Sequence, residues 1–229
     1  MESRTPRGEP RGPMDIERAQ TRINDQVQEE ITRRYGQAFY DAVLEGQVLS
    51  GIESWFAPFL QAAGKRRKDK DQPCRSPMEV AAKIAERSRP FVASPSLQVQ
   101  CGHGLMCAAL DLDHGIDEDE RAIALAGAAF GPERFRRQSL LEFDPRPQFK
   151  TIVVVEALGN EAMKQRQIPV FRNFFKEADR RLIDKGHLIV VEQDRFQDNI
   201  IEPLVGMDYE IQDVMSIKPS GLTLVITEK

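Results

Sequence analysis

The chain has few cysteines, few histidines and no long apolar run. Its three cysteines, Cys74, Cys101 and Cys107, are odd in number and lack the spacing of metal ligands, and the first residues do not resemble a signal peptide. We therefore expect a reducing, cytoplasmic location and no metal site. A membrane-spanning helix needs about 18 consecutive apolar residues, and the sequence contains no such run.

The charges of the chain are nearly balanced. A formal net charge of −4 gives no general attraction to nucleic acid or to an anionic membrane. The basic run at residues 65–71 can contact phosphates by charge alone, but it carries no interleaved aromatic residues. We therefore expect an exposed loop there, and neither a nucleic acid nor a membrane as partner.

Length and composition predict one main domain with an N-terminal extension. The chain has 229 residues, of which 41% are hydrophobic, enough for a sizeable core. Residues 1–13 are rich in Arg, Pro, Gly and Glu, a composition typical of a disordered tail. Residues 14–76 predict a helical extension, or a lid over a pocket, that includes the loop at 65–71. Residues 77–229 predict the main domain.

The clearest helical pattern of the extension lies between Asp15 and Tyr35. Apolar residues recur every three or four positions and predict one narrow buried stripe. The stripe can pack on the chain's own domain, or it can join the chain to a second copy or to a different subunit. Further apolar residues follow up to residue 60. We expect one of them, Trp55, either to pack in a core or to line a pocket. The stripe consists of Ile16, Ala19, Ile23, Val27, Ile31 and Tyr35.

A short strand followed by a glycine turn lies at residues 97–104, which read Leu-Gln-Val-Gln-Cys-Gly-His-Gly. Without Cβ atoms, Gly102 and Gly104 can adopt positive φ and bring backbone amides close to a ligand. The segment resembles the cofactor loop of class I S-adenosylmethionine (SAM)-dependent methyltransferases. In that family the strand carries an acid and the turn carries three glycines. Gln98 stands in place of the acid, and Gln100 stands in place of the first glycine.

The resemblance assigns the ribose hydroxyls of SAM to an acid that ends the second strand. Asp117 holds that position, and the same aspartate can cap the helix that follows. Only 13 positions separate Gly104 from Asp117, so the helix and the strand between them must be short. An alternative register makes Asp113 the acid. We prefer Asp117, because the next helix then starts in phase.

Two further segments resemble the third and fourth strands of the family. Residues 134–143 contain Ser139, in a pair that replaces the family's Gly-Asp beside adenine, followed by Leu140. Residues 148–158 contain an apolar run typical of a strand buried on both faces. Glu156 follows this run, at the edge where ligands bind in open α/β sheets.

The last third of the chain is the most similar to the family. Residues 170–183 are amphipathic at helical spacing, and residues 184–186 predict a stop before the fifth strand. Residues 206–214 and 221–227 resemble two antiparallel strands that close the sheet. The resemblance covers about residues 78–229. It implies an α/β, Rossmann-like fold with a seven-stranded, mostly parallel sheet in the order 3-2-1-4-5-7-6 and helices on both faces.

The resemblance also implies a SAM-dependent methyltransferase, and we expect its substrate to be a small molecule. Glu156 and His103 are the candidates for removing a proton from the methyl acceptor. Each has a structural alternative, as a strand-end carboxylate in water and as a packed or solvated histidine. The residues expected at the cofactor are Gln98, Cys101, Gly102, Gly104, Asp117, Ser139 and Leu140.

A second function stays open at this point, because several residues depart from the family pattern. Each hydrogen bond to SAM contributes about 0.5–3 kcal/mol, so four replacements together can weaken binding by orders of magnitude. The chain would then be a pseudo-methyltransferase that serves as a subunit or scaffold of an active partner. The replacements are Gln98, Gln100, Ser139 and Lys150.

Overall fold

The computed structural model describes residues 12–37, 40, 41, 77–144, 146, 148–158, 169–218 and 220–229. Residues 1–11 of the expected tail, Trp55 and the basic loop at 65–71 lie outside the described residues. Within the described ranges, no helix is long and apolar enough to cross a membrane.

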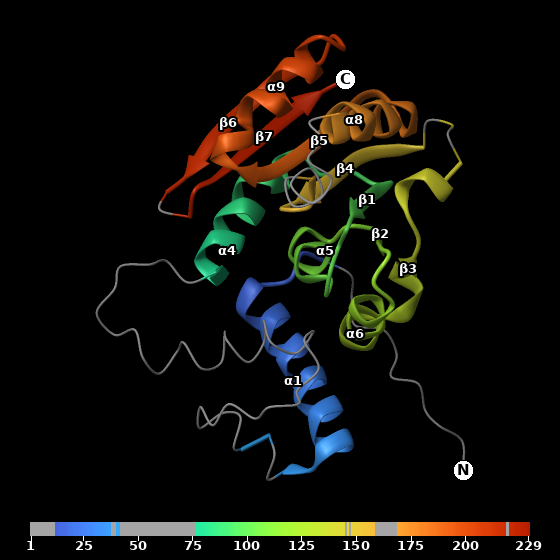
Figure 1. Cartoon of the computed structure of the whole chain (residues 1–229), viewed down its shortest axis with the longest axis vertical. Coiled ribbons are helices and arrows are strands. Elements are labelled where there is room, and N and C mark those ends of the chain that lie inside the picture. Colours follow the sequence, from blue (N-terminus) through green and yellow to red (C-terminus); the bar gives the residue numbers. More distant parts are fainter. Residues whose placement is uncertain are drawn as a thin grey trace.

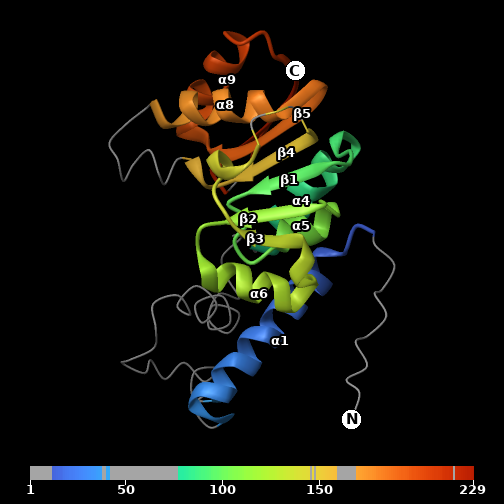
Figure 2. The ribbon, with the colours of Figure 1, turned by 90° about the vertical axis from the view of Figure 1, so that its right-hand side faces the viewer.

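The centre of the structure is a seven-stranded sheet in the order β3-β2-β1-β4-β5-β7-β6, which confirms the order that the resemblance implies (Figure 1). Neighbouring strands from β3 to β5 are parallel, whereas β7 runs antiparallel to both β5 and β6. Figure 2 shows β3, β2, β1, β4 and β5 following one another across the molecule. The strands are β1 (Ser96–Val99), β2 (His114–Asp117), β3 (Phe135–Arg137), β4 (Phe149–Val155), β5 (Leu182–Gln193), β6 (Glu210–Ile217) and β7 (Leu222–Glu228).

Helices cover both faces of the sheet, and the alternation of side chains along β4 shows how. Val153 packs in one core cluster with residues of α4 and α5, while Ile152 and Val154 pack in another with residues of α8 and α9. Because successive side chains of a strand point to opposite faces, a continuous apolar run fills both layers. These helices are α4 (Pro77–Ser88), α5 (Leu105–Leu110), α6 (Glu120–Phe130), α8 (Pro169–Arg181) and α9 (Gln197–Val205).

The N-terminal helix α1 (Ile16–Tyr35) packs on the chain's own domain. Asp15 caps it by accepting hydrogen bonds from the amides of Glu17 and Arg18. The expected stripe is buried from Ile16 to Ile31, whereas Tyr35 is exposed. Its middle part forms a cluster with apolar residues of α6, and α1 lies beside α5 and α6 in Figure 1. Of the two environments considered for the stripe, the structure shows the intramolecular one; association with a partner stays a prediction.

The helix expected at residues 170–183 ends earlier than its periodicity indicates. α8 ends at Arg181, and Leu182 already pairs with Phe149 of β4. The stop expected at residues 184–186 lies inside β5, where Lys185 has φ of 61° and donates its amide to the carbonyl of Lys229. The apolar pattern does not separate the two elements, because Leu182 is buried in either conformation.

The connection between Gly104 and Asp117 is as short as expected. α5 has six residues and β2 has four. α5 ends at Asp111, whose φ of 54° turns the chain towards β2. The strand then ends at Asp117, which confirms the preferred register. The alternative residue, Asp113, lies before β2 and accepts hydrogen bonds from the amide and hydroxyl of Ser96.

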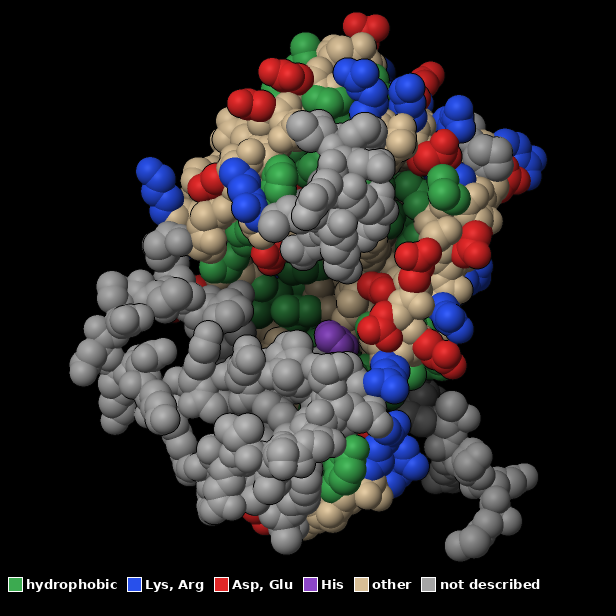
Figure 3. All heavy atoms as spheres, in the orientation of Figure 1, with side chains coloured by type: hydrophobic (Ala, Val, Ile, Leu, Met, Phe, Trp, Pro, Cys, Tyr) green, Lys and Arg blue, Asp and Glu red, His purple; other side chains and the backbone are tan. Residues whose placement is uncertain are grey.

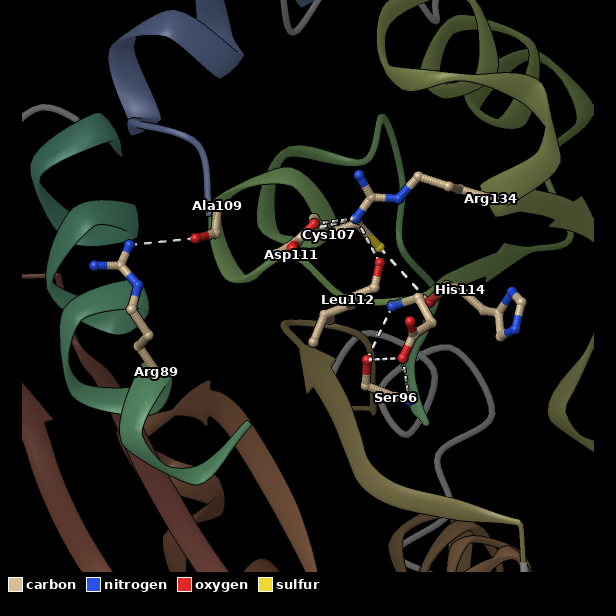
Figure 4. Close-up of polar contacts among 9 residues, drawn as sticks. Arg89, Ser96, Cys107, Ala109, Asp111, Leu112, His114 and Arg134 are labelled. Carbon is tan, nitrogen blue, oxygen red and sulfur yellow. Dashed lines mark hydrogen bonds and ion pairs between the residues drawn. The ribbon is translucent and has the colours of Figure 1, made fainter. Parts of the chain in front are cut away.

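Arg134 holds this short connection in place. Its guanidinium donates hydrogen bonds to the carbonyl oxygens of Cys107 and Leu112, and it lies 3.5 Å from the carboxylate of Asp111 (Figure 4). The side chain is only 13% exposed. A cation at the carboxyl end of a helix satisfies carbonyl groups that the helix itself leaves without donors.

We predict that Arg134→Met lowers the free energy of unfolding by about 2–3 kcal/mol, because buried carbonyl groups lose a charged donor. Denaturant titration followed by circular dichroism measures the loss. Arg136→Met, at an exposed position of β3, is the matched control. Equal stability of the two variants would contradict a clamping role for Arg134.

Candidate functional site

The turn after β1 is shaped by three residues with positive φ. Gln100, Gly102 and Gly104 have φ of 52°, 53° and 79°. A Cβ on Gly102 would meet no atom of the described residues within 4 Å, so its backbone faces open space among them. A Cβ on Gly104 would lie 2.8 Å from the ring of Phe135. Gly102 therefore leaves room for a ligand, whereas Gly104 is needed for close packing of α5 against β3.

Asp117 fixes this turn from the neighbouring strand. Its Oδ2 accepts a hydrogen bond of 2.9 Å from the amide of Gly102, and its Oδ1 accepts one of 2.9 Å from the amide of Asp119. The cap of α6 is Asp119, which accepts from the amides of Arg121 and Ala122. The alternative role of Asp117 as the helix cap is therefore wrong. Asp117 instead joins the ends of β1 and β2, and each carboxylate oxygen keeps a further lone pair for a ligand.

Gln98 is the most unusual polar residue of the site. It lies in β1, it is only 3% exposed, and its Oε1 accepts no hydrogen bond from any described residue. A buried acceptor without a donor costs about 1–3 kcal/mol, so such atoms are rare in folded proteins. A ligand that donates a hydrogen bond would remove this cost.

A pocket of about 270 Å³ opens beside this residue, at the carboxyl ends of β1 and β4. Its described lining includes Gln98, residues 100–103, Val155, and Gln20 and Ile23 of α1. Figure 3 shows a hollow floored by hydrophobic side chains, with a histidine at its edge and acidic side chains gathered on one side. The volume is slightly below the range of about 300–1,000 Å³ that is usual for small-molecule sites.

Two titratable residues of the pocket are uncharged near neutral pH. Burial lowers the pKa of His103, against the opposing influence of the carboxylates of Asp119 and Asp117. The pKa of the Cys101 thiol is raised by its hydrogen bond with Cys107 and by burial. Cys101 is therefore a neutral packing group and not a thiolate nucleophile.

Glu156 directly follows the pocket residue Val155, at the end of β4. It has φ of 50°, a conformation that is uncommon outside glycine. The residue is exposed, yet its carboxyl group is partly withdrawn from water, and this desolvation raises its pKa. A carboxylate of raised pKa beside a pocket is suited to accept a proton.

Two expected cofactor residues lie away from the pocket. Ser139 and Leu140 follow β3, and Leu140 is buried in the core beneath α8. The amide of Ser139 donates to the carboxylate of Glu142, which closes a short 3-10 turn. The residues brought together are thus Gln98, Cys101, Gly102 and His103, with Asp117 and Glu156 adjacent to them.

Gln20 and Ile23 were not expected in the site. The sequence predicts a helical extension or lid, and Trp55, the one residue of it considered for a place beside the pocket or in a core, lies outside the described residues. The available signal was the position of Gln20, a polar residue between two members of the apolar stripe, Ala19 and Ile23. A polar residue at the border of a buried stripe lies at the edge of whatever the stripe covers.

Sequence comparison finds no matching protein-family model and no matching curated protein. Comparison of structures finds SAM-dependent methyltransferases. The N-methyltransferase NodS from Bradyrhizobium japonicum WM9, in complex with S-adenosyl-L-homocysteine, aligns with a TM-score of 0.52 and 19% identity over 72% of this chain and 95% of NodS.

Two further solved structures are similar to the same degree. The ribosomal protein L11 methylase from Lactobacillus delbrueckii subsp. bulgaricus has a TM-score of 0.51 and 15% identity over 70% of this chain and 90% of its own. A SAM-dependent methyltransferase from Mesorhizobium loti has a TM-score of 0.50 and 16% identity over 66% of this chain and 98% of its own. The chain therefore has the Rossmann-like fold of class I SAM-dependent methyltransferases.

The lowered pKa of His103 predicts a pH dependence of stability. The unfolded chain takes up a proton near pH 6.5 and the folded chain only at lower pH, so stability is lost as the pH falls below about 6.5. Between pH 7.5 and 5.5 we expect the wild type to lose up to about 1.4 kcal/mol more than His103→Gln. Denaturant titrations at both pH values test this. Parallel losses in the two proteins would show that His103 titrates normally.

Proposed function

With the fold of class I SAM-dependent methyltransferases as the premise, we propose that this chain binds SAM and transfers its methyl group to a small molecule. The observation that carries the proposal is Gln98. Its Oε1 is a buried acceptor without a donor among the described residues, in a strand that borders a pocket at the ligand-binding edge of the sheet. The residues around it also fit the chemical groups of SAM.

The ribose would lie beside Asp117. Its carboxylate already accepts the Gly102 amide, and its remaining lone pairs suit two neighbouring hydroxyl groups. Gly102 offers bare backbone next to this carboxylate, so a sugar can approach there without meeting a side chain of the described residues. Adenine would lie towards the end of β3, near Ser139 and Leu140.

The reacting end of the ligand would lie on the other side, towards β4. SAM supplies an electrophilic methyl group on sulfur, so the chain has to hold the acceptor in line with it and to remove a proton. Holding two reactants in line is itself a large part of catalysis. Glu156 follows the pocket at this end, and its raised pKa makes it a better base than an ordinary carboxylate.

Binding of S-adenosyl-L-homocysteine (SAH), the demethylated product, tests the proposal directly. We expect isothermal titration calorimetry to show binding and thermal unfolding to shift upward with SAH concentration. Asp117→Asn should weaken this binding by about 1–3 kcal/mol, because a charged acceptor is lost. Unfolding without ligand shows whether the variant also loosens the Gly102 turn. No heat and no thermal shift in the wild type would favour the scaffold function.

Turnover tests the role of Glu156. With SAM and a set of small acceptors, we expect SAH to form, and Glu156→Gln to slow its formation by about 10²-fold or more without changing SAH affinity. The wild-type rate should fall as the pH drops towards the raised pKa of Glu156, because the base becomes protonated. A rate for Glu156→Gln equal to that of the wild type would assign proton removal to another group.

A further inference from the structure

A buried carboxylate lies beside the segment that carries Glu156. Glu192 of β5 is only 1% exposed, and the four residues before it, 188–191, are apolar and buried. Removing a carboxylate from water is costly unless hydrogen bonds compensate the loss. One such bond is present, since Oε1 of Glu192 accepts from the amide of Leu158 at 2.6 Å. The carboxylate therefore binds the chain just after the end of β4.

Two consecutive residues of β5 hold this segment. The amide of Glu156 donates to the carbonyl of Val191 at 2.7 Å, which continues the parallel pairing of β4 with β5 by one more bond. The two strands lie side by side in Figures 1 and 2. Two residues further along, the amide of Leu158 donates to the side chain of Glu192. Glu156 thus lies in a turn that is anchored to β5 at both of these amides.

The backbone of Glu156 needs such support. Its φ of 50° is unfavourable for a residue with a side chain, and such conformations persist only where the surrounding structure holds them. Ala157 and Leu158 are buried in the core that α8 covers, so the turn is attached on its far side as well. Because the backbone conformation sets the direction of the Cα–Cβ bond, the contacts that hold it also limit where the Glu156 carboxyl group can lie.

We propose that Glu192 is a positioning residue for proton removal. It holds the turn after β4 and so keeps the Glu156 carboxylate where the methyl acceptor would react. Glu192 is not among the described residues that line the pocket, so it acts through Glu156 and not on the reactants. An apolar residue at this position would avoid the desolvation of a carboxylate, but it would take this acceptor away from the Leu158 amide. The inference rests on the proposed function and adds a second carboxylate to it.

Three substitutions of Glu192 separate positioning from packing. Glu192→Met keeps the length of the side chain but removes the acceptor, so we expect kcat for SAH formation to fall about tenfold, with KM and SAH affinity unchanged. Glu192→Gln keeps an acceptor oxygen at the same place and should retain the wild-type kcat. Glu192→Asp keeps the charge but is one methylene too short to reach the Leu158 amide, so its kcat should fall as in Glu192→Met. Steady-state kinetics and calorimetry with SAH measure these quantities.

Dependence on Glu156 is the readout that a purely structural role would not move. If Glu192 acts through Glu156, its replacement has no further effect once the base is gone. The double variant Glu156→Gln/Glu192→Met should therefore form SAH at the rate of Glu156→Gln alone.

Tyr209→Phe is the matched control. Tyr209 is also buried, and its hydroxyl donates to Asp179 of α8 at 3.0 Å. Loss of this bond should lower the melting temperature and leave kcat unchanged. Thermal unfolding without ligand reports the stability of every variant. If Glu192→Met does not fold, the comparison of Glu192→Asp with Glu192→Gln carries the test.

The outcomes separate this inference from the proposed function. If the wild type forms SAH and Glu156→Gln slows it, a wild-type kcat in Glu192→Met and Glu192→Asp would overturn the positioning role and leave the methyltransferase function in place. Losses that multiply in the double variant, or a loss in Glu192→Gln equal to that in Glu192→Met, would overturn it as well. A wild type that neither binds SAH nor forms it would overturn both proposals.

Discussion

The hydrogen bond from the Gly102 amide to the Asp117 carboxylate is the interaction on which the candidate site depends. It joins the ends of β1 and β2. The segment between these two ends is short. A six-residue helix and a four-residue strand fill that segment. Arg134, just before β3, binds the carbonyl oxygens of Cys107 and Leu112 in the middle of that segment, so the segment is held there as well as at Asp117. A ligand at Asp117 would therefore meet a preformed surface.

The order of the strands follows from the resemblance to a known family, whereas single elements follow from their apolar patterns. The run in β4 and the narrow stripe of α1 appear where their periodicity places them. The boundary between α8 and β5 could not be predicted, because Leu182 is buried in either element. The cap of α6 was misassigned for a related reason. Asp117 and Asp119 both precede the helix, and only the three-dimensional hydrogen bonds distinguish them.

The candidate site was predictable only where one segment of chain forms it. Residues 98–104 carry their own turn signal, and Asp117 follows from the second strand. The contribution of Gln20 depends on how α1 packs against α5 and α6 beside the pocket, and no local pattern encodes that packing. The isolation of the Gln98 oxygen is likewise a property of its surroundings. Both features arise from contacts between distant segments, which is why sequence patterns alone could not provide them.

Ile23 of α1 belongs to two environments at once. It is 2% exposed in the cluster that attaches α1 to α6, and it also lines the pocket. A ligand that contacts Ile23 would therefore link occupation of the pocket to docking of α1. Thermodynamic linkage is reciprocal: if docked α1 strengthens ligand binding by some free energy, the bound ligand stabilises the docking of α1 by the same amount. The fraction of molecules with α1 docked would then depend on the occupancy of the pocket, although α1 itself takes no part in the reaction.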